Sequence, residues 1–566
     1  MSESAKVFST DVLVIGGGIA GLCAANKAAD QGADVLIAEK STAGWGGQMP
    51  LAGGAFSCIP TPEMVEAMVK FVVEEGEYLN DQEWTYTFVK DTHPCVQEML
   101  GWGVPFGKEM DGKLKLARGG GVAMLVRSEK CLPTLLGRVL EKGAKVLNKV
   151  YMVDLLKRGD RVVGAVGFHY ETGDFCIIQS KATILACGGC NYKARGLWHM
   201  NCGEGVAMAY NAGAELRNAE FANQFMVSNK YTLRDTRAAR DATKLFENAL
   251  GESMLEKYPD MEPTLDPRNP SWMTGMLFKR WVRAWYKEIE AGKGPIYLNY
   301  TRHPELAAGF GDTARLADIN HGYMNMMQRL GIDISKEKVE WVVVPEFHAG
   351  PIRVDLNCET TLPGLYATGD ATQNGSAFQG AVEGCGLTGG VPLGFAMVTG
   401  FRAGTAAGKA TVRTPKPEFS SDEVEKSKSE IFAPLGKKDG YNPYDAIKEI
   451  QEVVFKLKNS FIKHKERLEA ALGMIEEIKA KLPNLAAKDS HELVRCHEAK
   501  SMVVSAEALY RASLMRTETR GTNVREDYPG RDDKDWLKWI VIKREGEEMK
   551  LWTEPVPIEK YKLKPG

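Results

Sequence analysis

The chain has 566 residues, with 72 Lys and Arg against 74 Asp and Glu and a formal net charge of −2. At roughly 100–200 residues per domain, this length predicts about three or four structural units. Charge this balanced carries neither the electrostatic footprint of a nucleic-acid-binding protein nor a polybasic membrane anchor, so we expect neither partner.

Glycine and cysteine stand out in the composition. There are 58 glycines, above the usual ~7% of residues. The 11 cysteines are an odd number, and the polar segment Met1 to Thr10 lacks the features of a secretory signal. We therefore expect reduced thiols and a cytoplasmic location. The run from Gly384 to Arg402 is long enough for a membrane span, but its glycines and Pro392 argue against one.

The N-terminal segment has the order of elements that binds a dinucleotide. Residues 11–15 are an apolar run that predicts a buried parallel strand, and residues 16–21 (GGGIAG) then fit GxGxxG. An Ala-rich helix from Leu22 to Ala29 and a second strand over 33–38 follow, and that strand ends in Glu39. This βαβ context is the one that the motif requires.

Each glycine of this motif has a physical role. Gly16 permits the tight turn, Gly18 lets the backbone approach a pyrophosphate, and Gly21 lets helix and strand pack closely. Glu39, 18 residues after Gly21, can accept both ribose hydroxyls. The motif alone does not distinguish FAD from NAD.

Later glycine-rich segments favour FAD. Residues 41–54 (STAGWGGQMPLAGG) form a loop that can present backbone N–H groups to a ring system. Residues 182–189 predict another buried strand that ends in glycines, and Asp370 closes a strand over 364–370 as it would to bind a flavin's ribitol.

The other predicted elements are read from periodicity. Residues 61–105 are typical of amphipathic helices, and residues 150–181 of alternating strands with turns at 158–160 and 171–174. Residues 421–515 have apolar positions at helical spacing, and residues 536–566 read as mixed strands and loops.

Several motifs together resemble one family. They are the N-terminal fingerprint and the Gln48–Gly54 loop, then CGEG at 202–205 with AGA at 212–214. Next come Glu220-Phe221 with Gln224-Phe225, and ATGD at 367–370. The last are RTETRG at 516–521 and REDYPGRDD at 525–533. In these features the chain resembles the flavoprotein subunits of the succinate dehydrogenase/fumarate reductase superfamily, including the adenylylsulfate reductase alpha subunit.

The resemblance implies an α/β fold: a Rossmann-like FAD-binding domain with an inserted capping domain and a C-terminal helical bundle. The expected segments are the first part of the FAD-binding domain at 1–225, the capping domain at 226–344, and the second part of the FAD-binding domain at 345–415. A helical domain at 416–515 and a tail on the FAD domain at 516–566 complete the chain.

The resemblance also implies which residues hold FAD. They are Gly16, Gly18, Ile19, Ala20, Gly21, Glu39, Lys40, Ser41, Gly46, Gly47, Gln48, Gly53, Gly54, Ala186, Gly188, Gly189, Glu204, Asp370, Pro392 and Leu393.

Departures from the family pattern bear on the chemistry. Several members carry a His in the 41–54 loop that bonds covalently to the flavin. This loop has none, so we predict non-covalent FAD. Leu387 and Glu383 stand where fumarate-type members place an Arg and a His that clamp substrate carboxylates, and the catalytic Arg falls near Phe278. A conventional dicarboxylate site is therefore not expected.

Three residues are the candidates for catalysis. His348 matches the substrate-side His of the family, and a His suits proton transfer near neutral pH. Arg280 and Arg283 lie near the family's catalytic segment, where one could replace the lost donor; a solvated helix face is the alternative.

Cysteines and histidines indicate no metal site. The chain has no run of closely spaced cysteines typical of an iron–sulfur cluster. Cys187 and Cys190 have CxxC spacing, for which a redox dithiol and simple packing are the two explanations.

Three functions stay open. The first is hydride transfer between the flavin and an organic, unsaturated or acidic small molecule. The second is adenylylsulfate-reductase-like chemistry at sulfur, and the third is an electron-relay module without its own substrate. Since cluster cysteines are absent, we expect a separate iron–sulfur or other electron-transfer subunit.

Overall fold

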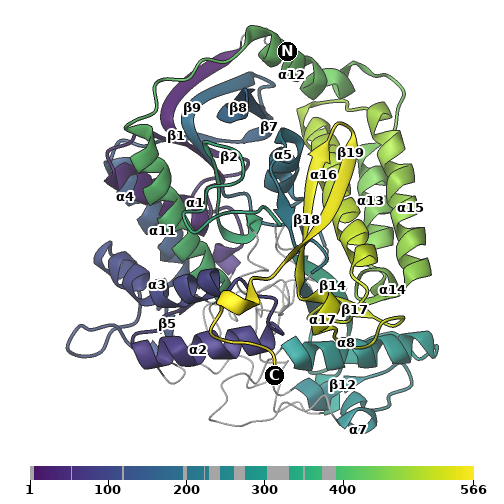
Figure 1. The fold of residues 1–566 in the computed structure, drawn as a ribbon. Helices are drawn as coiled ribbons and strands as arrows, with labels where there is room; N and C mark the ends of the chain where they lie inside the picture. Colours follow the sequence, from purple (N-terminus) through teal and green to yellow (C-terminus); the bar gives the residue numbers. More distant parts are fainter. Residues whose placement is uncertain are drawn as a thin grey trace.

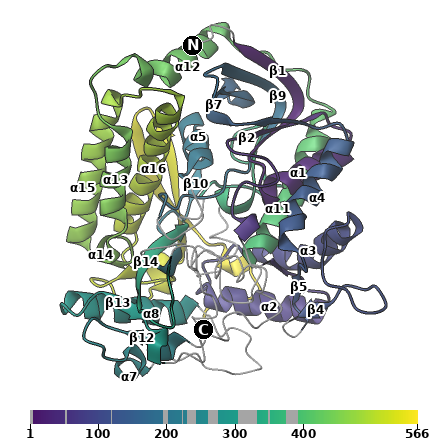
Figure 2. The ribbon, with the colours of Figure 1, turned by 180° about the vertical axis from the view of Figure 1, so that it is seen from behind.

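The computed structural model describes residues 5–51, 54–117, 120–194, 201–221, 223–228, 242–259, 275–302, 331–347, 351–372 and 391–566. Figure 1 shows the central sheet and the helices α1, α4 and α11 on one side, and the long C-terminal helices on the other. A smaller sheet with α8 lies at one end of both, as the reverse view also shows (Figure 2).

A seven-stranded sheet forms the centre of the described structure, in the order β6-β2-β1-β9-β8-β7 with β15 on β9. Its strands are β1 (Lys6–Ile15), β2 (Val35–Glu39), β6 (Lys145–Asn148), β7 (Val150–Arg158), β8 (Arg161–His169), β9 (Phe175–Leu185) and β15 (Leu365–Ala367). The predicted strands of the nucleotide-binding unit and of 150–181 are confirmed.

The long strand β9 joins two kinds of pairing. It runs parallel to β1 along most of its length, pairs antiparallel with β8 through Phe175–Gln179, and pairs parallel with β15 through Thr183–Leu185. The carboxyl ends of β1, β2, β9 and β15 therefore meet at one edge of the sheet, which is where open α/β sheets bind ligands.

Two helices on the sheet cross at very close range. They are α1 (Ile19–Asp30) and α11 (Val391–Thr411). A Cβ at Gly400 would collide with the Ala20 carbonyl oxygen, and one at Gly404 with that of Ala24. Gly400 and Gly404 thus allow this close helix–helix contact. None of the helices in the described ranges has both the length and the apolar character needed to cross a membrane.

Further helices and a small sheet surround this core. They are α2 (Pro62–Glu75), α3 (Gln82–Gly101), α4 (Cys131–Glu141), α5 (Glu204–Ala212), and the three strands β3 (Ala55–Ser57), β4 (Leu116–Ala117) and β5 (Val122–Met124). Thr61 and Asp81 cap the N-termini of α2 and α3, which confirms the predicted helices over 61–105.

A second sheet has a core of its own. Its order is β11-β14-β13-β12, and every pairing is antiparallel. The strands are β11 (Asn223–Ser228), β12 (Phe246–Glu247), β13 (Ile296–Leu298) and β14 (Val339–Phe347), with helices α7 (Met254–Lys257) and α8 (Gly275–Glu290). Trp281, Trp285 and Trp341 surround Phe246 in this core. The segment predicted to cap the cofactor therefore packs around an apolar cluster separate from that of the central sheet, and Phe461, Ile462 and Val524 of the C-terminal part also belong to this cluster.

The C-terminal third is mainly helical. Its elements are α12 (Ser421–Phe432), α13 (Pro443–Val454), α14 (Leu457–Ser460), α15 (Lys465–Lys481), α16 (Ser490–Met515) and α17 (Asp533–Trp536), with the short strands β16 (Ile462–Lys463) and β17 (Val524–Arg525). Asp489 caps α16 by accepting from the backbone N–H groups of His491 and Glu492. The helical prediction for 421–515 is confirmed.

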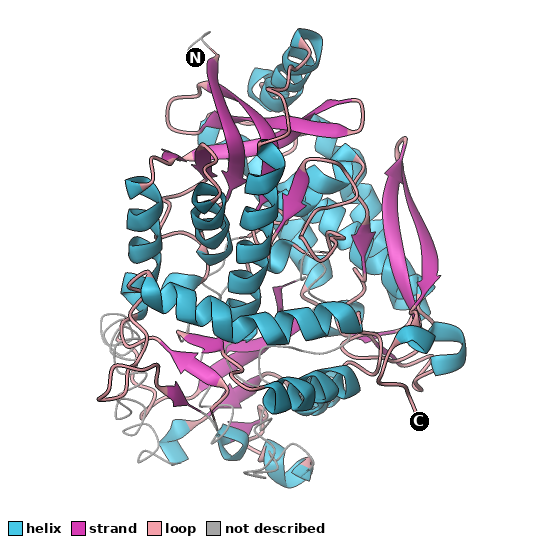
Figure 3. Cartoon of the chain, turned by 60° about the vertical axis from the view of Figure 1, so that its left-hand side comes forward, coloured by secondary structure: helices cyan, strands magenta, loops and turns pink. Residues whose placement is uncertain are grey.

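The last strands return to the first domain. β10 (Leu216–Arg217) pairs with β18 (Lys538–Glu545), which forms a hairpin with β19 (Glu548–Pro555). This hairpin runs along the outside of the molecule (Figure 3). The mixed strands and loops predicted for 536–566 are therefore present.

Candidate functional site

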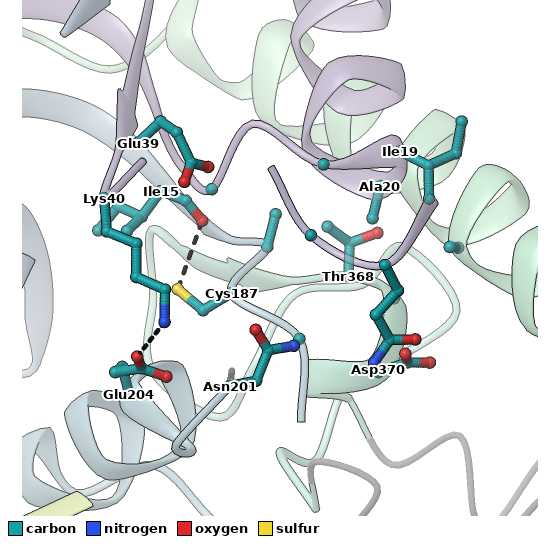
Figure 4. A pocket seen from close by; sticks show the side chains of 18 of the residues that line it. Ile15, Ile19, Ala20, Glu39, Lys40, Cys187, Asn201, Glu204, Thr368 and Asp370 are labelled. Carbon is teal, nitrogen blue, oxygen red and sulfur yellow. Dashed lines mark hydrogen bonds and ion pairs between the residues drawn. The ribbon is translucent and has the colours of Figure 1, made fainter. Parts of the chain in front are cut away.

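A pocket enclosing about 960 Å³, including space open to solvent, lies at the carboxyl edge of the central sheet. Its walls come from the β1–α1 turn, the end of β2 and the loop after it, β7, the end of β9, α5, the end of β15 and the start of α11 (Figure 4). Segments from residue 15 to residue 396 thus converge on one cavity.

Gly16 and Gly21 of the β1–α1 turn have the packing roles that the motif predicts, and Gly18 lies at an open position. Gly16 has φ +111°, and a Cβ there would collide with the Ala186 carbonyl oxygen. A Cβ at Gly21 would collide with the Gly16 carbonyl oxygen. At Gly18, by contrast, a Cβ would meet no atom of the described residues within 4 Å. Gly18 therefore leaves open the space that the pocket offers to a ligand.

The N-terminus of α1 suits an anion. Gly18 is its N-cap residue and supplies no side-chain hydrogen bond to the first turn, which contains no acidic residue. Helix N-termini carry unpaired N–H groups and a positive dipole end, which together bind phosphate groups.

Glu39 is buried and held in place at the end of β2. One carboxylate oxygen accepts from the Gly17 N–H (2.6 Å), and the other from the Ser41 N–H and hydroxyl (2.8 Å each). A carboxylate has about four acceptor positions, and three are filled here, so about one remains for a ligand's hydroxyl group. The orientation of Glu39 is set before any ligand binds.

Lys40 and Glu204 form an ion pair in the adjacent wall, with Nζ and Oε1 2.5 Å apart (Figure 4). The other oxygen of Glu204 accepts from the Cys202 N–H (3.0 Å). Burial by itself raises the pKa of Glu204, but the charge of Lys40, together with the hydrogen bonds from Lys40 and from the backbone, holds that pKa below its usual range. Burial likewise disfavours charged Lys40, yet Glu204 raises the Lys40 pKa overall. Both groups are thus ionised at neutral pH.

The opposite end of the pocket is formed by β15 and α11. Asp370 lies in a short helical turn directly after β15, and Gly369 donates its N–H to the Thr399 hydroxyl (2.9 Å). Pro392 and Leu393 follow from the start of α11. The same hydroxyl of Thr399 also accepts from Thr368, so the two segments are tied together.

Most of the residues predicted to hold the cofactor line this pocket. They are Gly16, Gly18, Ile19, Ala20, Glu39, Lys40, Gly47, Gln48, Ala186, Gly188, Glu204, Asp370, Pro392 and Leu393.

Five predicted residues do not line it: Gly21, Ser41, Gly46, Gly54 and Gly189. Gly21 serves packing against Gly16, and Ser41 orients Glu39. A Cβ at Gly46 would press on Ser41 and Glu39, so this glycine supports the loop from behind. Gly54 faces Leu125, and its carbonyl accepts from the Leu125 N–H. Gly53 lies outside the described residues.

Sequence reasoning missed twelve lining residues: Ile15, Ala38, Met49, Val150, Tyr151, Met152, Cys187, Asn201, Met208, Thr368, Gly369 and Ala396. Four of them adjoin motif residues at strand ends, a position from which they could have been predicted: Ile15, Ala38, Thr368 and Gly369. The β7 residues carried no signal, because only the order of the strands in the sheet brings β7 to the pocket.

The predicted catalytic residues do not appear in the described walls. His348 lies outside the described residues, as do Glu383 and Leu387. Arg280 belongs to α8, whose side chains are described only from Trp281 onward. Arg283 is exposed on α8, on the side away from buried Trp281 and Trp285, and it does not line the pocket. Its position matches the solvated helix face that the sequence left open.

The cysteines near the pocket are free thiols. Cys187 lines the pocket and donates to the Ile15 carbonyl oxygen (3.4 Å), whereas Cys190 is buried. Burial raises the pKa of both thiols, so neither is an activated thiolate. Packing therefore explains this CxxC segment.

One group in the described structure has the spacing of metal ligands: Cys202, Glu204 and Glu498. Both carboxylates already pair with cations, Glu204 with Lys40 and Glu498 with Lys193 and Arg495. A further cation would bring positive charge beside these three, which disfavours a metal here.

Taken together, the pocket fits FAD on features of its own. It offers an open cradle at Gly18, an uncapped helix N-terminus, and a buried carboxylate held at the end of the second strand.

Comparisons with known proteins agree. A model of the FAD binding domain matches residues 11–388, and a model of the fumarate reductase flavoprotein C-terminus matches residues 448–566. An uncharacterised FAD-dependent oxidoreductase of Methanocaldococcus jannaschii is 28% identical over 96% of this chain and 97% of its own. One subunit of the fumarate reductase (CoM/CoB) of Methanothermobacter marburgensis is 25% identical over 96% of this chain and 98% of its own.

A solved structure shows the same fold. The adenylylsulfate reductase of Archaeoglobus fulgidus superposes with a TM-score of 0.78 at 22% identity, over 97% of this chain and 96% of that one. The fold class predicted from the sequence is therefore confirmed. The chain belongs to the FAD-binding flavoproteins of the fumarate reductase and succinate dehydrogenase family, and it is an FAD-dependent oxidoreductase.

Proposed function

We propose that the pocket described above holds FAD, and that the chain transfers hydride between the flavin and an unsaturated organic acid or a related small molecule. The observation that carries this proposal is the open cradle at Gly18 and the α1 N-terminus, with Glu39 on one side and Asp370 and Pro392 on the other. This order matches the diphosphate, ribose and ring portions of an extended dinucleotide.

Each wall has a task in the proposal. The first turn of α1 binds the diphosphate, and Glu39 accepts a hydrogen bond from a ribose hydroxyl. Lys40 and Glu204 orient the adenosine end, while Asp370, Pro392 and Leu393 position the opposite end. The flavin, when bound, supplies the capacity to accept or donate a hydride or single electrons. The second sheet, which has its own core beside the first domain, is proposed to exclude water from the reacting face.

The proposed attachment of FAD is non-covalent. The loop from Ser41 to Gly54 contains no His, Cys or Tyr that could bond to the flavin. We expect acid precipitation of the holoprotein to release all yellow colour into the supernatant, as measured by flavin absorbance. Flavin that stays with the protein pellet and migrates with the chain in a denaturing gel would contradict this prediction.

A separate subunit is proposed to exchange the electrons. No group of cysteines with cluster-like spacing occurs among the described residues; the one group with ligand spacing contains a single cysteine. The Methanothermobacter relative is named as a subunit, which fits a chain that works within a complex. We propose an iron–sulfur protein or another one-electron carrier as this partner.

The experiment reduces the holoprotein anaerobically and follows reoxidation of the flavin by candidate acceptors. Fumarate and other unsaturated acids, enoyl thioesters, adenylylsulfate and sulfite form the panel. Reoxidation by an unsaturated acid or thioester is the expected result. Reoxidation by adenylylsulfate alone would replace the proposal with chemistry at sulfur, and no reoxidation by any compound would favour an electron relay.

A further inference from the structure

The N-terminal half of α16 reaches the wall of the proposed cofactor pocket through Glu498. This side chain is buried, and one of its carboxylate oxygens lies within 4.8 Å of a Glu204 oxygen and of the Cys202 sulfur. Glu204 itself lines the pocket and pairs with Lys40. A residue of the C-terminal helices thus stands directly behind the polar wall of a pocket built from the first domain.

The charge of Glu498 and the charges of the Lys40–Glu204 pair depend on each other. Two carboxylates at such a distance in a buried place repel strongly unless each has its own cation. Glu204 has Lys40, and Glu498 has Lys193 at 2.6 Å together with Arg495. The negative charge of Glu498 also contributes to keeping Lys40 protonated, since it is one of the groups that raise the Lys40 pKa.

Glu498 also holds the backbone that continues from the pocket. The chain passes from Gly188 in the pocket wall to Tyr192 and Lys193, which adopt left-handed conformations with φ +52° and +53°. Such conformations cost energy for residues other than glycine and persist only when neighbours hold them. Here Gln451 of α13 donates to both of their carbonyl oxygens, and Glu498 holds the Lys193 side chain.

We propose that Glu498 is a positioning residue through which docking of α16 shapes the adenosine end of the FAD site, so that cofactor binding and the order of the C-terminal helices are coupled. This inference rests on the proposed location of FAD in the pocket. Because such coupling is reciprocal, bound FAD stabilises the docked position of α16 by the same free energy by which docked α16 strengthens FAD binding.

The chain offers a closely matched control for this proposal. Glu507 is also buried on α16 and also pairs with one Lys and one Arg, namely Lys479 and Arg511. It does not line the pocket or belong to the Glu204 group. Glu498→Gln and Glu507→Gln therefore remove the same charge from the same helix in equally buried surroundings.

The experiment titrates FAD into each apoprotein by flavin fluorescence and measures hydrogen exchange of α16 with and without FAD. We expect Glu498→Gln to raise the Kd at least about tenfold and to abolish the protection of residues 490–500 by FAD. Glu507→Gln should stay within about twofold of wild type in Kd. If Glu498→Gln fails to fold, Lys193→Gln against Lys479→Gln gives a comparison from the cationic side, in which the Lys479 side chain is more exposed (46% against 15%).

Wild-type affinity in Glu498→Gln and Lys193→Gln would overturn the proposal. An equal loss in both members of a matched pair would overturn it too, because the effect would then be general destabilisation. Failure of the cofactor site itself has a separate signature: Gly18→Val would bind FAD as tightly as wild type.

Discussion

At the scale of single residues, the absence of a side chain at Gly18 is the feature on which the proposed binding of a dinucleotide depends. Gly16 and Gly21 are constrained by carbonyl oxygens that a Cβ would strike, whereas Gly18 faces open space. Packing therefore requires glycine at positions 16 and 21, whereas at position 18 we propose that ligand binding requires it.

The substitution Gly18→Val tests that reason. The backbone at Gly18 has φ −78° and ψ −170°, which valine adopts without strain, so the apoprotein should keep its fold. The added methyl groups would fill the cradle, and we expect FAD affinity to fall at least about a hundredfold in fluorescence titration. Gly473→Val is the control, because a Cβ at Gly473 in α15 also meets no described atom within 4 Å. Equal affinity in the two variants would show that FAD binds elsewhere.

Lys463 is a buried residue with a marked expected pH signature. Its ammonium donates to the Glu220 carbonyl (2.9 Å), the Ser513 hydroxyl (2.8 Å) and the Asn523 amide oxygen (2.8 Å). Burial lowers its pKa to about 7; the charge of Glu220 opposes this, and those of Arg525 and Arg516 add to it.

The sign of the effect follows from proton binding. An unfolded chain keeps its lysines near pKa ~10.4, so between about pH 7 and 10 the unfolded state binds one proton more than the folded state. The contribution of Lys463 to the free energy of unfolding, taken as the difference between wild type and Lys463→Met, should therefore rise with pH in this window by up to ~1.4 kcal/mol per unit, and this rise should be absent below about pH 7. Urea unfolding of wild type and Lys463→Met across pH 6–9 measures it. Lys448→Met, at an exposed lysine, is the control and should keep the pH dependence of wild type. The same pH dependence in Lys463→Met would assign the slope to other groups.

At the scale of elements, the crossing of α1 and α11 gives Gly400 and Gly404 a role in packing. Gly400 and Gly404 lie one turn apart on α11 and let it approach Ala20 and Ala24 at backbone distance. Small residues at this spacing allow close helix contact in water as they do in lipid. This contact also fixes the start of α11, which supplies Pro392 and Leu393 to the pocket.

Gly404→Ala should therefore destabilise the protein although alanine favours helices. The helix propensity gain of about 1 kcal/mol is opposed by a collision with the Ala24 backbone, and overpacking costs about 1–3 kcal/mol or more. Thermal unfolding of the apoprotein is the measurement. Gly473→Ala, where a Cβ meets open space, should raise the Tm; a rise in both variants would mean that the crossing can relax.

At the scale of the whole molecule, a buried charge network joins segments that are far apart in the sequence. Arg516 donates to Glu220 (2.7 Å) and Glu518 (2.8 Å), and Arg520 continues to Glu518 and Asp533. Glu220 lies shortly before β11 begins, so the network anchors the point where the chain leaves the first domain for the second sheet.

Breaking this network should be costly. Arg516→Gln leaves the Glu220 carboxylate buried without its cation, and we expect a loss of about 3–5 kcal/mol in the free energy of unfolding. Arg531→Gln removes a partly exposed partner of Asp533, and it should cost less than about 1 kcal/mol. Denaturant titration of both variants checks the difference. Similar losses would mean that burial does not determine how much these ion pairs contribute to the free energy of unfolding.

Much of the site follows from local sequence because glycines, strand ends and a fixed acidic position constrain the backbone within a few dozen residues. The βαβ unit, Glu39 and the strand before Asp370 were predictable on that basis. The β7 wall was not, since β7 reaches the pocket only through its place at the edge of the sheet. For Arg283 the sequence suggested a catalytic role, because an Arg near this position could replace the lost donor. In the structure, however, burial of Trp281 and Trp285 turns Arg283 toward solvent.

The sequence by itself determined the cofactor class and the elements of the nucleotide-binding unit, because those depend on backbone requirements that are written in short motifs. The tertiary structure alone decided which charges meet: Lys40 with Glu204, Glu498 beside that pair, and Arg516 with Glu220. The partners of the first pair are 164 positions apart in the chain, and those of the last are 296 positions apart. No local pattern encodes such pairs, since their energies arise only when folding removes both partners from water.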